Sequence, residues 1–184
     1  VFTKVLGTVE SNIGQITVTA PSGLELTIAA PPEGAYLSAS SLTVEGTVQP
    51  ATATVSVNGQ PATVSAGEYS ATLTNLTEGP QTVTVVATAG TESLTRTRTL
   101  VIDRIAPQLT NLQPPPNTWF ATNEATVTGQ IVEDNLSSFT INDVPITVTN
   151  GTFSTTIPLD SENANLLSLH LEDLASNTSD LSLT

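Results

Sequence analysis

Apolar and polar residues alternate at every second position through much of this sequence. Val83 and Val85 alternate with threonines, and Leu167, Leu169 and Leu171 alternate with polar residues. A period of two places successive side chains on opposite faces of a half-buried strand. Glycine and proline clusters interrupt these runs roughly every 8 to 12 residues, the spacing typical of β-sandwiches. The pattern therefore predicts an all-β protein.

We expect two sandwiches of seven short antiparallel strands each, divided between sheets of three and four strands. In the first, the expected strands are 24–28, 42–48, 54–57, 61–64, 69–74, 81–88 and 94–102. In the second, they are 108–112, 124–132, 138–141, 145–148, 152–157, 166–171 and 178–184.

An internal repeat supports this division. The segments 57–61, 67–73 and 31–32 recur 84 residues later as 141–145, 151–157 and 115–116. Gly46 and Gly129 are 83 residues apart, which implies that one residue is lost between the first and second strands. A fixed period of this kind indicates tandem structural units.

The same 84-residue step extends towards the N-terminus, where 16–19 takes the place of 100–103. We therefore interpret residues 1–20 as the last strands of a truncated preceding repeat, or as a donor strand. Residues 21–104 and 105–184 are expected to form immunoglobulin-like β-sandwich repeats, joined by a proline-containing linker.

The excess of acidic residues limits the classes of partner that this chain can bind. The chain has 4 Lys and Arg against 17 Asp and Glu, a formal net charge of −13, and only 11% charged residues. Nucleic acids and anionic membranes require clustered basic residues, so both are excluded as expected partners. The chain has no cysteine, which excludes disulfides and thiolate chemistry. We find no apolar run as long as the roughly 20 residues that a membrane helix needs.

Several short motifs carry a resemblance to a known family. They are Val44-Glu45-Gly46, Val55-Ser56-Val57-Asn58-Gly59, Gly67-Glu68-Tyr69, Asp103-Arg104-Ile105-Ala106-Pro107 and the turn Glu172-Asp173-Leu174-Ala175-Ser176-Asn177. On these motifs the chain resembles the bacterial Ig-like repeats of surface adhesins and of accessory domains in secreted glycoside hydrolases. It departs from the family pattern at Asp143, where glycine is usual, and at Leu171, where a small residue is common. The resemblance implies a secreted or cell-surface protein without catalytic function.

Catalytic chemistry finds no support in the sequence. The one histidine, His170, lies between Leu169 and Leu171, which take the inward phase, so we expect it to face solvent. No nucleophile elbow, phosphate-binding loop or zinc-protease motif is present. The chain is therefore expected not to be an enzyme.

Four acidic residues are candidate calcium ligands. Asp103 lies in the predicted linker, Glu133 and Asp134 form a loop between strands, and Asp173 lies at a strand end. Calcium binds several carboxylate oxygens, and domain junctions of rigid stalks are common places for it. The alternative is that these acids only cap turns through Asx hydrogen bonds. No other cofactor is expected.

Trp119 and Phe120 are candidate ligand-binding residues because exposed aromatic rings stack on sugars. Both follow a proline turn, however, and Tyr36 occupies the equivalent region upstream. We therefore favour a packing role for these rings over a sugar platform.

Three functions remain open. The leading one is a structural spacer in an extracellular stalk of the adhesin type, whose partners are neighbouring repeats of the same chain. The second is a subunit of a self-assembling filament, in which residues 1–19 donate a strand to another copy. The third is a carbohydrate-binding accessory module of a polysaccharide-degrading enzyme. A host or matrix glycan or protein is a further expected partner.

Overall fold

The computed structural model describes residues 23–160 and 164–184, and every regular element among them is a β-strand. The first half contains β1 (Glu25–Leu26), β2 (Ala35–Leu37), β3 (Leu42–Gln49), β4 (Thr54–Val57), β5 (Gln60–Pro61), β6 (Thr63–Ser65), β7 (Glu68–Leu73), β8 (Gly79–Ala89) and β9 (Glu92–Ile102). The second contains β10 (Gln108–Gln113), β11 (Glu124–Val132), β12 (Leu136–Ile141), β13 (Val144–Pro145), β14 (Thr152–Pro158), β15 (Leu167–Asp173) and β16 (Thr178–Leu183). The expected terminal strands within residues 1–20 lie outside the described residues.

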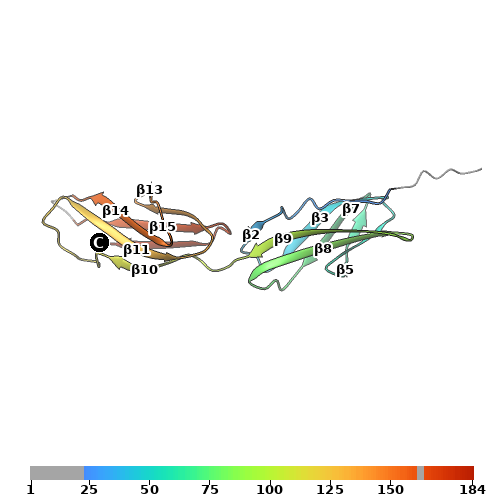
Figure 1. The fold of residues 1–184 in the computed structure, drawn as a ribbon, viewed down its shortest axis with the longest axis horizontal. Helices are drawn as coiled ribbons and strands as arrows, with labels where there is room; N and C mark the ends of the chain where they lie inside the picture. Colours follow the sequence, from blue (N-terminus) through green and yellow to red (C-terminus); the bar gives the residue numbers. More distant parts are fainter. Residues whose placement is uncertain (1–22, 161–163) are drawn as a thin grey trace, which may run out of the picture.

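These strands form two sandwiches in a row along the chain (Figure 1). The first pairs a sheet of order β1-β3-β7-β6 with a sheet of order β2-β9-β8-β4-β5. The second pairs β10-β11-β14 with β13-β12-β15-β16. The all-β immunoglobulin-like fold predicted from the alternation is confirmed.

Three details differ from the expected strands. The short β2, absent from the expected strands, pairs with β9 in parallel, so the first sandwich holds more than the seven expected strands and they are not all antiparallel. The expected strand 61–64 divides into β5, which pairs with β4, and β6, which pairs with β7 in the opposite sheet. In place of the expected strand 145–148 the structure has the two-residue β13, and Ile146 beyond it still donates a 2.9 Å hydrogen bond to the Phe139 carbonyl oxygen of β12.

Each sandwich has its own apolar core. Fourteen buried residues between Leu26 and Ile102 form the first core, and nine between Ala125 and Leu171 form the second. Buried residues alternate with exposed ones along β3 and β11, as the sequence pattern predicts. The boundaries 21–104 and 105–184 stay a prediction, but the two clusters share no residue.

The repeated asparagine explains one part of the repeat motif. Asn58 and Asn142 both adopt a positive φ, at 47° and 50°, in the hairpin turns after β4 and β12. Each side-chain oxygen accepts a hydrogen bond of 2.8 Å from a backbone N–H of the neighbouring strand, that of Thr84 or Ser168. Asparagine thus supplies both the left-handed conformation and a bond that fixes the hairpin to its sheet.

The repeated glycine has a packing reason. Gly46 lies opposite Tyr69, and Gly129 lies opposite Phe153, in the pairs β3–β7 and β11–β14. A Cβ on Gly129 would lie 2.7 Å from the Phe153 ring, and one on Gly46 would lie 2.1 Å from the Thr27 carbonyl oxygen. Both positions therefore exclude a side chain so that an aromatic ring can cross the strand.

Candidate functional site

Three of the four predicted acidic residues meet where the two sandwiches join. Asp103 directly follows β9, Glu133 directly follows β11, and Asp173 is the last residue of β15. One carboxylate oxygen from each lies within 4.8 Å of the others. Asp134 does not belong to this group. We call Asp103, Glu133 and Asp173 the junction cluster.

The turn after β15 fixes Asp173 rigidly. Its Oδ1 accepts hydrogen bonds from the backbone N–H groups of Ala175 (2.8 Å) and Asn177 (2.9 Å). Its Oδ2 accepts a bond of 2.7 Å from the Asn177 side-chain amide. Ser176 takes a φ of 62° in this turn, a conformation that favours glycine.

The same turn also holds the linker. The Asn177 side-chain amide donates a second hydrogen bond, of 2.8 Å, to the Asp103 carbonyl oxygen. The Ser179 hydroxyl donates a bond of 2.6 Å to the Pro107 carbonyl oxygen. Side chains of the second sandwich therefore bind the backbone at both ends of the linker. The motif that includes Asn177 was visible in the sequence, whereas nothing in the sequence indicated Ser179.

The junction cluster gathers negative charge without a basic partner. Asp103 is 8% exposed and Asp173 is 1% exposed. Within residues 23–160 and 164–184 the ion pairs are Arg98–Glu33, Arg104–Glu78 and His170–Asp180, and none includes the cluster. Arg104, the basic residue next to Asp103 in the chain, points its guanidinium to Glu78 at 3.4 Å. Backbone N–H groups donate hydrogen bonds to all three carboxylates, and three carboxylate oxygens from separate segments are also a hard-cation donor set.

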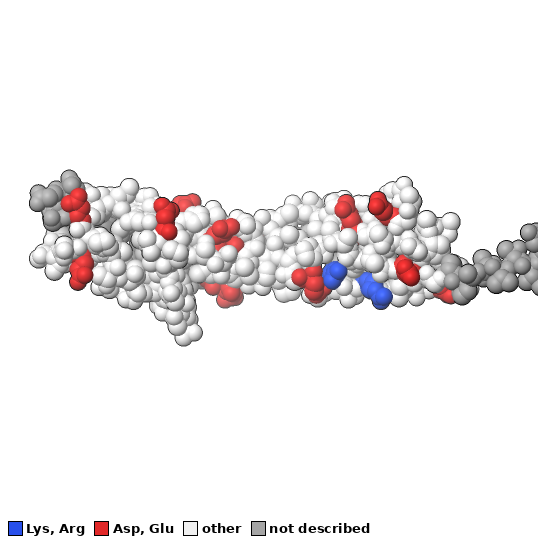
Figure 2. All heavy atoms as spheres, turned by 90° about the horizontal axis from the view of Figure 1, so that it is seen from above, with Lys and Arg blue, Asp and Glu red and all other residues white. Residues whose placement is uncertain are grey.

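Acidic side chains also outnumber basic ones over the rest of the surface. No Lys or Arg follows Arg104 in the sequence, so the charged side chains of the second sandwich are all acidic, apart from His170 when it is protonated. Figure 2 shows the basic side chains over the first sandwich only, with acidic ones over both. This surface favours cations over phosphate-bearing partners.

His170 takes the exposed place that its strand phase predicts. Its side chain is 40% exposed, and its Nδ1 lies 2.7 Å from Asp180 Oδ1 on the neighbouring strand β16. This is a surface pair on one sheet face, and of its two residues Asp180 lines a shallow hollow together with Pro107 and Leu171. It supplies no nucleophile.

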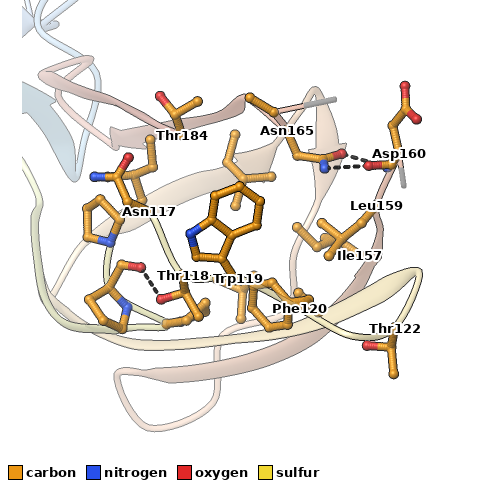
Figure 3. A pocket seen from close by; sticks show the side chains of 18 of the residues that line it. Asn117, Thr118, Trp119, Phe120, Thr122, Ile157, Leu159, Asp160, Asn165 and Thr184 are labelled. Atoms are coloured by element: carbon orange, nitrogen blue, oxygen red, sulfur yellow. Dashed lines mark hydrogen bonds between the residues drawn. The ribbon is translucent and has the colours of Figure 1, made fainter. Parts of the chain in front are cut away.

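The aromatic candidates lie at the other end of the second sandwich. Trp119 is 96% exposed and Phe120 is 39% exposed, so the packing role expected for Trp119 is wrong. The reason is local, because the segment around Trp119 belongs to no strand, whereas the equivalent Tyr36 lies in β2. Both rings border an open hollow of about 770 Å³ lined by Val127, Ile157 and other apolar residues (Figure 3).

Within the described ranges no helix is long and apolar enough to cross a membrane.

Comparison with known proteins places the fold. Residues 24–104 match the family model "Glucodextranase, domain B". The fibronectin(III)-like modules of Clostridium thermocellum CbhA are similar in structure, with a TM-score of 0.55 and 16% identity over 86% of this chain and 91% of theirs. Sidekick-1 immunoglobulin domains 1–5 align with a TM-score of 0.48 and 15% identity, over 90% of this chain and 40% of that one. No curated protein matches the sequence.

The family match spans the first sandwich, and the structural match spans both. At 16% identity the structural match establishes the fold and not an activity. The resemblance noted in the sequence motifs is confirmed: the fold is an immunoglobulin-like β-sandwich, and residues 24–104 are similar to glucodextranase domain B.

Proposed function

We propose that this chain is a non-catalytic spacer of a secreted protein, and that Ca²⁺ bound at the junction cluster stiffens the connection between its two sandwiches. The observation that carries the proposal is the convergence of Asp103, Glu133 and Asp173 on one point from three separate segments. Asp103 belongs to the linker, whereas the other two belong to the second sandwich. A cation bound to all three would therefore fix the linker to that sandwich.

The hydrogen bonds at the junction support a spacer even before a cation is considered. Asn177 and Ser179 bind linker carbonyl oxygens, so the linker is not a free tether. Short linkers with proline and fixed contacts limit bending, and this is the property that a spacer needs. The absence of a nucleophile–base pair among the described residues is consistent with a non-catalytic role.

The setting of the spacer follows from the family match. Glucodextranase carries a domain of the type found at residues 24–104. This favours a secreted polysaccharide-degrading enzyme as the host protein. The adhesin stalk predicted from the sequence stays a prediction.

Calcium titration by isothermal calorimetry tests the cation site. We expect one site per chain with a dissociation constant of about 0.1 to 1 mM, the range of extracellular calcium modules. Asp103→Asn and Asp173→Asn should each abolish the heat of binding. Asp134→Asn is the matched control, because this neighbour of Glu133 removes the same charge outside the cluster and should bind as the wild type does.

Thermal unfolding gives a second readout. At ten times the dissociation constant, bound calcium stabilises the folded state by about 1.4 kcal/mol. The melting temperature of the second sandwich should rise by several degrees, and a chelator should reverse the rise. Binding that persists in both Asp→Asn variants, or no binding at 10 mM calcium, would refute the cation site and leave only the hydrogen-bonded linker.

A further inference from the structure

Two arginines of this chain each have a glutamate partner of their own. Arg98 Nη1 lies 3.7 Å from Glu33 Oε2, and Arg104 Nη2 lies 3.4 Å from Glu78 Oε2. Both glutamates belong to the first sandwich, so both guanidinium groups are held there. The second pair bears on the junction between the sandwiches, because Arg104 follows Asp103 directly in the chain.

Arg104 is fixed to the first sandwich by its backbone and by its side chain. Its backbone N–H donates a 2.9 Å hydrogen bond to Glu78 Oε1. Its guanidinium donates to the carbonyl oxygens of Ala39 at 3.3 Å and Leu76 at 3.2 Å. Ala39 lies between β2 and β3, and Leu76 lies between β7 and β8. Arg104 thus joins two loops of the first sandwich to the linker.

Glu78 supplies the charged part of this attachment. Its carboxylate accepts from the Arg104 N–H and faces the guanidinium, and contacts of a charged group are about twice as strong as neutral ones. The two carbonyl contacts, at 3.2 and 3.3 Å, are at the long limit of hydrogen bonds. The position of the Arg104 side chain therefore depends on the charge of Glu78.

The junction cluster is a competing anionic site in the same stretch of chain. The Ile105 N–H donates a 3.1 Å hydrogen bond to Asp103 Oδ1, so the linker turns around this carboxylate, with Arg104 in the turn. Carboxylate oxygens of Asp103, Glu133 and Asp173 lie within 4.8 Å of one another, and the ion pairs of the described residues leave all three without a basic partner. Such a group of carboxylates attracts a guanidinium that is free to reach it.

We propose that Glu78 keeps the junction cluster open to a cation by holding Arg104 on the first sandwich. The proposal rests on the proposed cation site and names the residue that controls access to it. When Glu78 carries no charge, the Arg104 guanidinium moves to the cluster and occupies it as an internal cation. Glu78 acts through Arg104, so it is a positioning residue and not a ligand.

Calcium titration of the full chain tests this role. Glu78→Gln keeps the shape of the side chain and removes its charge, and it should weaken calcium affinity about tenfold, the effect of a competing contact of about 1.4 kcal/mol. The double variant Glu78→Gln with Arg104→Gln removes the competitor as well and should restore the wild-type affinity. Glu33→Gln is the matched control, because it removes the same charge from the Arg98 pair, and it should bind as the wild type does.

Arg104→Gln alone separates this role from a long-range charge effect. Because Glu78 already withholds the guanidinium, this variant should bind calcium within about twofold of the wild type, so the two substitutions are not additive. Equal and opposite changes in affinity for the two single variants would mean that only distant charge is felt, and would overturn the proposal.

A second measurement needs no calcium. In a chelator, calorimetry of Glu78→Gln should show the second sandwich melting a few degrees above the wild type, because the guanidinium now compensates the three carboxylates. The double variant should melt as the wild type does. Loss of an ion pair in the first sandwich cannot by itself stabilise the second, so this rise is specific to a moved arginine.

The two measurements separate the proposal from the cation site on which it rests. Wild-type calcium affinity and an unchanged melting temperature in Glu78→Gln would overturn the role of Glu78 and leave the cation site standing. A wild-type chain that binds no calcium would refute the cation site, and the melting temperature in chelator would then decide the role of Glu78 alone.

Discussion

Replacing Gly46 with alanine tests why each repeat keeps a glycine in its second long strand. The new Cβ would lie 2.1 Å from the Thr27 carbonyl oxygen and 2.6 Å from the Tyr69 hydroxyl oxygen. Neither distance is tolerated, so both the Thr27 backbone and the Tyr69 ring have to move. The ring is 2% exposed, and its hydroxyl donates a 2.7 Å hydrogen bond to the same Thr27 oxygen.

The loss in free energy of unfolding caused by Gly46→Ala can be estimated from these contacts. Overpacking a buried site costs about 1–3 kcal/mol, and the lost hydrogen bond adds about 1 kcal/mol. The lower entropy of the unfolded alanine chain returns about 0.5–1 kcal/mol. The net loss of about 1–3.5 kcal/mol should lower the melting temperature of the first sandwich by about 4–28 °C.

Differential scanning calorimetry measures this directly. Gly23→Ala is the control, since a Cβ there meets nothing within 4 Å. Gly129→Ala should cost less than Gly46→Ala, because its clash is with the Phe153 ring edge at 2.7 Å and no hydrogen bond is lost. Near-UV circular dichroism identifies the affected sandwich, because both tyrosines lie in the first and the tryptophan lies in the second. Unchanged stability of Gly46→Ala, within 0.5 kcal/mol, would refute the account of the glycine.

Further predictions concern pH, a turn and an exposed ring. Burial raises the pKa of Tyr69 to about 12, against a reference of about 10, so between these pH values the folded state keeps the phenol proton that the unfolded state loses. The free energy of unfolding should therefore fall by roughly 2–3 kcal/mol between pH 10 and 12. Tyr69→Phe should remove this part of the pH dependence in urea titrations. Ser176→Gly should stabilise the second sandwich by about 0.5–1 kcal/mol because φ is 62° there; equal or lower stability in urea would count against it. Trp119→Ala should leave the urea midpoint of the second sandwich unchanged, because the ring is 96% exposed; a large fall in the midpoint would show that the ring packs.

The sequence predicted the fold well because period-two alternation and the 84-residue repeat are local signals that core burial enforces. The hairpin at Asn58 and the glycine at Gly46 were recognised as motifs, and the structure supplies their reasons. The parallel pair β2–β9 was missed, because a three-residue strand carries too little pattern to show its direction.

The candidate sites were predictable only in part. Asp103, Glu133 and Asp173 were identified as acidic residues near a junction, but their convergence depends on how three segments fold together. Asp134 was included because it adjoins Glu133 in sequence, but it lies in the bend after β11 and its carboxylate does not join the cluster. The exposure of Trp119 could not be foreseen from the residue itself, because it depends on whether the segment around it joins a strand, and in the structure it does not.

Distance measurement between two spin labels tests the central claim, a stiff junction, most directly. The chain has no cysteine, so Thr72→Cys and Thr156→Cys place one label at an equivalent exposed strand position in each sandwich. With calcium present, pulsed electron paramagnetic resonance should give one narrow distance distribution, which broadens in Asp173→Asn. A distribution that is equally broad with and without calcium, in wild type and variant alike, would contradict the account.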